Sequence, residues 1–117
     1  MTDRMGPQAD VHIWRDEQGT VKANVKHLAH HSPSGFECGY HGSGPADLAL
    51  SILARFVPLE AGTPSERLYR GQRFSLFAWQ HHQEFKREFI APLGSAGGVI
   101  PARDIAAWID ARRGDVI

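Results

Sequence analysis

The chain has 117 residues, a length that suits one domain and is too short for two of ordinary size. Its 13 basic and 13 acidic residues cancel and 42% of its residues are hydrophobic, which is typical of a globular protein and disfavours both nucleic-acid binding by bulk positive charge and acidic mimicry of DNA. The single cysteine cannot form an internal disulfide and suits a reducing cytoplasm, and the sequence shows neither a signal peptide nor an apolar run of about 20 residues, so we expect no membrane association.

Two strands are predicted at the start of the ordered chain. Apolar and polar residues alternate over residues 11–15 and 21–25, as in strands with one buried face. A three-residue loop over residues 17–19 puts Gly19 in the left-handed position that such a hairpin needs. This register keeps the apolar residues on one face by pairing Ile13 with Ala23 and Val11 with Val25. We therefore expect an N-terminal β-hairpin.

The middle of the chain combines a glycine-rich turn with a helix. The alternating residues 36–40 predict a short third strand or an extended segment, and the turn follows it. Gly44 is the expected N-cap of a helix from about Pro45 to Val57, with Asp47 in its first turn, where negative charge is favourable. Residues 58–73 are rich in Pro, Gly and basic residues, and we interpret them as a long loop or a short helical insertion.

The last third predicts two more helices. One begins near Ser75 and carries an aromatic stripe at a spacing of four: Phe77, His81, Phe85 and Phe89. A brief strand is expected from Gly97 to Ile100, and Pro101 opens a third helix that buries Ile105, Trp108 and Ile109. The sequence thus predicts an α+β domain over residues 11–117, after a flexible N-terminus at 1–10. Its small antiparallel sheet, with the N-terminal β-hairpin, packs against two or three helices.

Residues 35–50, GFECGYHGSGPADLAL, resemble the signature of a small bacterial, phage and plasmid family, domain-of-unknown-function family 6166. The chain departs from that signature at Cys38 and His41, where the family has tryptophan and glycine, and at Val99, where tryptophan is common. The resemblance implies a bacterial cytoplasm and mobile genetic elements as the setting. It implies no enzymatic activity.

The glycine-rich turn is the first candidate binding site. Backbone N–H groups at a helix N-terminus attract anions, so Gly42, Ser43, Gly44 and Asp47 are candidate ligand- or anion-binding residues. The turn lacks the Lys-Ser/Thr of a phosphate-binding loop and the full dinucleotide motif. The alternative is a tight turn whose glycines supply positive φ and close packing.

Metal binding and catalysis have weaker candidates. Cys38 and His41 have the two-residue gap of a chelating pair, yet structural zinc sites usually offer at least two cysteines. We therefore expect no metal and no cofactor. Catalysis needs a nucleophile and a base held together, and no spacing in this chain brings such a pair into contact. We assign no catalytic residue, and the balance is against an enzyme.

A local basic cluster, made of Arg67, Tyr69, Arg70 and Arg73, is the remaining candidate surface. On one helical turn these side chains would grip phosphates or an acidic protein. The alternative is a solvated loop whose charges Glu60 and Glu66 balance.

The hypothesis that these observations favour is a non-enzymatic cytoplasmic interaction or regulatory protein of a bacterium or phage, possessing a protein partner and belonging to a mobile element or a counter-defence system. Exposed aromatics such as Trp14 or Tyr69, with Arg70 and Arg73, would anchor the partner. An open hairpin edge would allow strand addition, a homodimer included. Two alternatives stay open. One is a nucleotide- or anion-binding domain, or a small hydrolase, that uses residues 39–47. The other is a nucleic-acid-binding protein that uses the arginine cluster.

Overall fold

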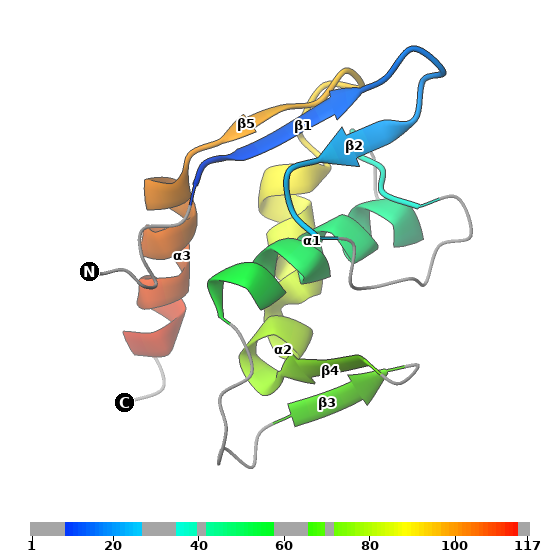
Figure 1. The fold of residues 1–117 in the computed structure, drawn as a ribbon. Helices are drawn as coiled ribbons and strands as arrows, with labels where there is room; N and C mark the ends of the chain where they lie inside the picture. The colour runs from blue at the N-terminus through cyan, green and yellow to red at the C-terminus, as the bar shows by residue number, and fades with distance from the viewer. Residues whose placement is uncertain (1–8, 27–34, 40–41, 58–65, 70–71, 115–117) are drawn as a thin grey trace.

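The structure is a computed structural model that describes residues 9–26, 35–39, 42–57, 66–69 and 72–114. The side chains of residues 66–69, 72–73 and 113–114 are not described. The expected α+β architecture is confirmed (Figure 1). In chain order the elements are β1 (Val11–Arg15), β2 (Val21–Ala23), α1 (Ser43–Phe56), β3 (Glu66–Tyr69), β4 (Gln72–Ser75), α2 (Leu76–Phe85), the π-helix η1 (Lys86–Ile90), β5 (Gly98–Ile100) and α3 (Ala102–Gly114).

The main sheet has the strand order β2-β1-β5, with both pairings antiparallel. The predicted hairpin register is confirmed, because Ile13 lies opposite Ala23. Gly19 adopts a φ of 81°, and its N–H donates to the Asp16 carbonyl at 2.9 Å. The Asp16 side chain also accepts from the N–H of Thr20 at 3.0 Å. The aspartate thus fixes the loop length, and with it the apolar face.

The hairpin ladder ends sooner than expected, at Ala23. The Asn24 side chain, not its backbone carbonyl, accepts from the N–H of His12 at 2.9 Å. The freed carbonyl turns toward α1 and accepts from Arg55 at 2.8 Å. The predicted pairing of Val11 with Val25 therefore lies outside the observed ladder, although both side chains are buried.

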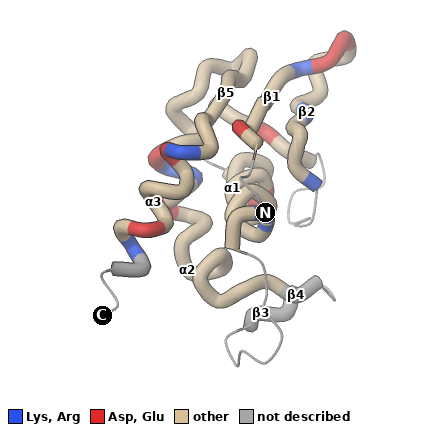
Figure 2. Tube along the Cα trace, turned by 60° about the vertical axis from the view of Figure 1, so that its left-hand side comes forward, with Lys and Arg blue, Asp and Glu red and all other residues tan. Residues whose placement is uncertain are grey.

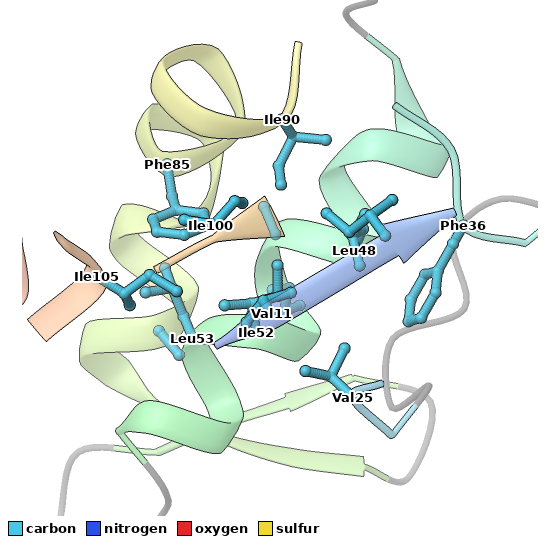
Figure 3. Close-up of a cluster of buried hydrophobic side chains, with 14 of the residues drawn as sticks. Val11, Val25, Phe36, Leu48, Ile52, Leu53, Phe85, Ile90, Ile100 and Ile105 are labelled. Carbon is cyan, nitrogen blue, oxygen red and sulfur yellow. The ribbon is translucent and has the colours of Figure 1, made fainter. Parts of the chain in front are cut away.

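The core lies between the sheet and the helices. Ten of its side chains, contributed by the sheet, by residues 25 and 36 and by all the helices, converge in Figure 3. Val11, Leu48 and Phe85 are completely buried. Each helix therefore has one face against the same apolar cluster, and the opposite face of the sheet is left to solvent.

The first helix begins earlier than predicted, at Ser43, with Gly42 as its N-cap. Gly44 lies inside the helix and is buried, so its expected role as the cap is wrong. Asp47 falls beyond the first turn, which holds no acidic residue, and it is 0% exposed. Gly44 packs against residues 35–37 and Pro45 is buried, so the proline lies in the first turn of a helix that begins two residues before it. The predicted dipole interaction of Asp47 is therefore also wrong.

The interpretation of residues 58–73 as a loop or helical insertion is wrong where the structure describes them. Residues 66–69 and 72–75 form a second antiparallel hairpin, β3–β4, with Arg67 opposite Phe74. This hairpin lies beside the start of α2, on the side of the helices that faces away from the main sheet (Figure 1). Phe74, 1% exposed, ties β4 to the core. Residues 58–65 and 70–71 lie outside the described residues.

Helix α2 begins where the sequence predicts. The Ser75 hydroxyl accepts from the N–H of Ala78 at 3.2 Å and donates to the Val57 carbonyl at 2.7 Å. The helix continues into η1, where the N–H of Ala91 donates to the Lys86 carbonyl at 2.9 Å, an i→i+5 bond. The strand expected at 97–100 and the helix expected after Pro101 are both present. No helix within the described ranges has the length and apolarity needed to cross a membrane.

Candidate functional site

The glycine-rich turn packs tightly against the segment that precedes it. A Cβ on Gly44 would lie 2.8 Å from the Glu37 Cβ and 2.9 Å from the Gly35 carbonyl oxygen, both shorter than real contacts. The backbone of residues 35–37 therefore covers one side of the first turn of α1. The close approach of this segment to α1 leaves no room for a side chain at position 44, so packing explains the glycine there. Ligand binding by Gly42, Ser43, Gly44 and Asp47 stays a prediction, and exposed Ser43 is its most accessible member.

A second glycine of this region, Gly39, holds the segment against the end of η1. Its N–H donates to the Ile90 carbonyl at 3.1 Å, and its φ of 83° favours glycine. A Cβ at this position would lie 3.2 Å from the Leu93 carbonyl oxygen. Residues 35–39 alternate buried and less buried side chains, as an extended segment does, but they form no strand. The predicted third strand is therefore not formed over residues 36–39, and Tyr40 lies outside the described residues.

Arg15 joins three parts of the chain around this segment. Its guanidinium donates to Glu37 Oε1 at 3.0 Å and to the Gly19 carbonyl at 2.8 Å, and also to the Ser95 carbonyl. The side chains of Arg15 and Glu37 are 29% and 24% exposed. A partly buried, multiply bonded ion pair stabilises more than an exposed one. The signature residues thus form a structural joint between the hairpin, α1 and the turn that follows η1.

Two polar residues are buried along α1 behind this joint. Asp47 and Ser51 are 0% and 1% exposed, and their spacing of four puts them on one face of the helix. Both have interactions within the fold. Their burial indicates a structural polar contact beneath the surface, because buried polar groups are nearly always hydrogen-bonded. The sequence predicts Asp47 in the first turn of the helix and gives no signal of this buried role.

Cys38, one half of the metal candidate, is 2% exposed. Its Sγ lies 3.7 Å from the Gly94 carbonyl oxygen and 3.9 Å from that of Ser95. Burial raises the pKa of the Cys38 thiol, and nearby Arg15 only partly offsets this. His41 lies outside the described residues. Among the side chains that the structure describes, no three His, Cys, Asp or Glu gather as metal ligands.

The basic cluster is not helical. Arg67 and Tyr69 belong to β3 and Arg73 to β4, whereas Arg70 lies outside the described residues. Arg73 aligns with Leu68, and Arg67 with Phe74, so these two arginines are not cross-strand partners. The prediction that the cluster lies on one helical turn is therefore wrong, because its described residues form a hairpin. Binding of nucleic acid or protein by these residues stays a prediction.

A network of hydrogen bonds and ion pairs joins α2 and η1 to α3. The Arg112 guanidinium carbon lies 3.6 Å from the Trp108 ring centroid, and the same group forms two hydrogen bonds with Glu84, at 2.9 and 3.1 Å. Trp108 Nε1 donates to Glu88 Oε1 at 2.9 Å. The hydrogen bond from Arg112 holds the pKa of Glu84 below its ordinary value. Three members of the stripe, His81, Phe85 and Phe89, have ring contacts with Trp108 and so also pack against α3.

The outer face of the main sheet is the exposed apolar surface of the fold. Trp14 and Val99 are 45% and 51% exposed and are the large exposed hydrophobic residues in the described part of the chain. Trp14 lies opposite Lys22 and Val99 opposite His12. These four side chains share one face, which we call the outer sheet face. The sequence reasoning named Trp14 but missed Val99, whose exposure depends on β5 joining the sheet beside β1.

A small groove borders the β2 edge of this sheet. Its volume is about 240 Å³, below the roughly 300–1,000 Å³ of small-molecule sites. The groove is lined by Thr20, Val21, Lys22, Ala23, Val25, Gly35 and Phe36. A second groove, of about 280 Å³, lies between η1, β5 and the start of α3. Its carboxylates, Glu88 and Asp104, already contact Arg112 and Arg103.

Together these features define a small α+β protein whose main sheet has an exposed outer face and whose glycine-rich segment joins the sheet to the helices. A family model describes the same chain: residues 4–71 match a family of unknown function (DUF6166). The match covers more than half of the chain, so the protein belongs to that family. No curated protein matches it, and neither does any solved structure. The match ends before α2, although its glycine-rich part contacts residues 90–95.

Proposed function

We propose that the protein is a non-enzymatic module that binds a protein partner through its outer sheet face. The observation that carries the proposal is that Trp14 and Val99 stand on the same face, while the helices cover the other. Tryptophan is among the residues that dominate the binding energy of interfaces. Lys22 and His12 border the apolar pair, in the manner of a polar rim.

The fold gives this surface a rigid base. Ile13, between His12 and Trp14 in β1, is 3% exposed, and β1 has a strand on each side. An anchor on a central strand loses little conformational freedom when it binds, which favours affinity. The family resemblance supports a partner in the cytoplasm of a bacterium, encountered by a protein of a phage or mobile element. This setting is part of the proposal.

The test compares the double variant W14S/V99S with wild type and with R103S. Arg103 lies in α3, so it is not part of the outer sheet face, and its side chain is 89% exposed. A partner captured from bacterial lysate is identified, purified and titrated against all three proteins. We expect W14S/V99S to bind at least about tenfold more weakly, as interface anchors do, and R103S to bind like wild type. Equal affinity of wild type and W14S/V99S would refute the outer sheet face as the binding surface.

A further inference from the structure

The outer edge of β2 carries open backbone groups. The N–H of Asp16 donates to the Thr20 carbonyl at 2.9 Å, and that of Asn24 to the His12 carbonyl at 3.2 Å. Bonded and non-bonded pairs alternate along an antiparallel ladder. Hence the backbone N–H and C=O groups of Lys22 bond to β1, whereas those of Val21 and Ala23 point away from β1. Within the described residues, no hydrogen bond engages these outward groups of Val21 and Ala23.

The groove described above runs beside this edge. The side chains of Val21 and Val25, with that of Phe36 on the opposite wall, are buried and give it an apolar floor. Its volume of about 240 Å³ suits the side chains of a short peptide. An added strand would bond to the outward groups of Val21 and Ala23, and its residues opposite these two would point to the groove.

Charge selects the partner strand. Lys22 and Lys26 are both exposed along this stretch of chain, while acidic residues gather at the tip of the β1–β2 hairpin (Figure 2). If a second copy of the chain paired its β2 edge with this one through the outward groups of both residues, Val21 would lie opposite Ala23 of that copy. In this register Lys22 lies directly opposite Lys22 of the second copy. Like charges directly opposite each other are destabilising. The edge therefore disfavours self-pairing and favours a strand with a carboxylate opposite Lys22.

We propose that the β2 edge binds an extended segment of the partner protein with the pattern apolar–acidic–apolar. The two apolar residues lie opposite Val21 and Ala23 and fill the groove. The acidic residue lies opposite Lys22 on the outer sheet face, with Lys22 between it and Trp14. The inference rests on the proposed function, because it names the chemistry of a partner for the same sheet.

The probe is a blocked heptapeptide with a Val-Glu-Val core, titrated into the full-length protein by two-dimensional amide NMR. We expect the amide signals of Val21 and Ala23 to shift with the peptide concentration. The matched peptide with a Val-Lys-Val core should bind about fivefold more weakly, because a repulsive cross-strand pair replaces an attractive one. The K22E variant should reverse this preference. The A23P variant removes the outward N–H of Ala23, to which the added strand would bond, so it should lose peptide binding. This N–H does not face β1, so the substitution removes no hydrogen bond between β1 and β2. The result with K22E keeps the test decisive whether or not A23P folds.

The outcomes separate this inference from the proposed function. Absence of shifts at Val21 and Ala23, equal binding of the two peptides, or an unchanged preference in K22E would overturn the inference, as would a homodimer formed through β2. If the captured partner still requires Trp14 and Val99 in any of these cases, the proposed function stands and only the edge is wrong. If the peptide binds as expected while W14S/V99S retains the partner, the outer sheet face is wrong and the edge stands.

Discussion

Replacement of Gly44 by alanine tests whether the glycine-rich turn is a packing joint. The added Cβ would lie 2.8 Å from the Glu37 Cβ, 3.0 Å from the Glu37 Cγ and 2.9 Å from the Gly35 carbonyl oxygen. Two of these atoms belong to the backbone or are attached directly to it, so they move only if the segment moves. Overpacking of this kind costs about 1–3 kcal/mol, whereas the helix propensity of alanine returns up to about 1 kcal/mol.

The net expectation for G44A is a loss of about 1–2 kcal/mol in the free energy of unfolding. For a chain of this length that lowers the melting temperature by roughly 4–8 °C. Urea unfolding gives the free energy and calorimetry the temperature. The control is G94A, because a Cβ on Gly94 would meet nothing within 4 Å; its stability should change by less than about 0.5 kcal/mol. A G44A protein as stable as wild type would show that residues 35–37 do not lie against α1.

Three other results follow from the described contacts. R112A should lower the free energy of unfolding at pH 7 by about 1 kcal/mol or more. The difference from wild type should become smaller as the pH falls from 5 to 3, because Glu84 has a lowered pKa and loses its stabilising charge on protonation. A difference measured by urea unfolding that stays constant with pH would contradict this. S75A removes both an N-cap and a buried hydrogen bond, so it should cost about 2 kcal/mol by the same assay, and a loss below about 0.5 kcal/mol would contradict the cap. Cys38 should react with a thiol reagent at pH 8 at least about tenfold more slowly in the native protein than in urea; equal rates would mean that the thiol is exposed.

Local patterns in the sequence predicted the local structure well. Alternation over two strands and a glycine at one loop position were enough for the hairpin register, because a shift of one residue would expose its apolar face. A serine followed by an aromatic stripe was enough for the start of α2. In both cases the deciding interactions join residues close in sequence.

Contacts between distant segments decided the errors. The strands β3 and β4 carry charged residues and little apolar alternation, and Phe74 buries against the rest of the fold, so composition indicated a loop. The glycine-rich turn reads as a ligand loop until Glu37 and the end of η1 are placed against it. Val99 becomes part of a candidate surface only because β5 pairs with β1. None of these contacts has a periodic signal in the sequence.

The pairing of β1 with β5 also constrains the order of folding. Val11 lies opposite Ile100, so the central strand of the sheet finds its second neighbour only after all the elements from β2 to η1 have been synthesised. Until then a nascent chain has a hairpin with one unsatisfied inner edge and an uncovered apolar face. Such long-range closure is slow and leaves partly folded chains prone to association. The stretch that matches the family model, residues 4–71, contains none of α2, η1, β5 and α3, so the segments that complete the core and the sheet follow it in the chain.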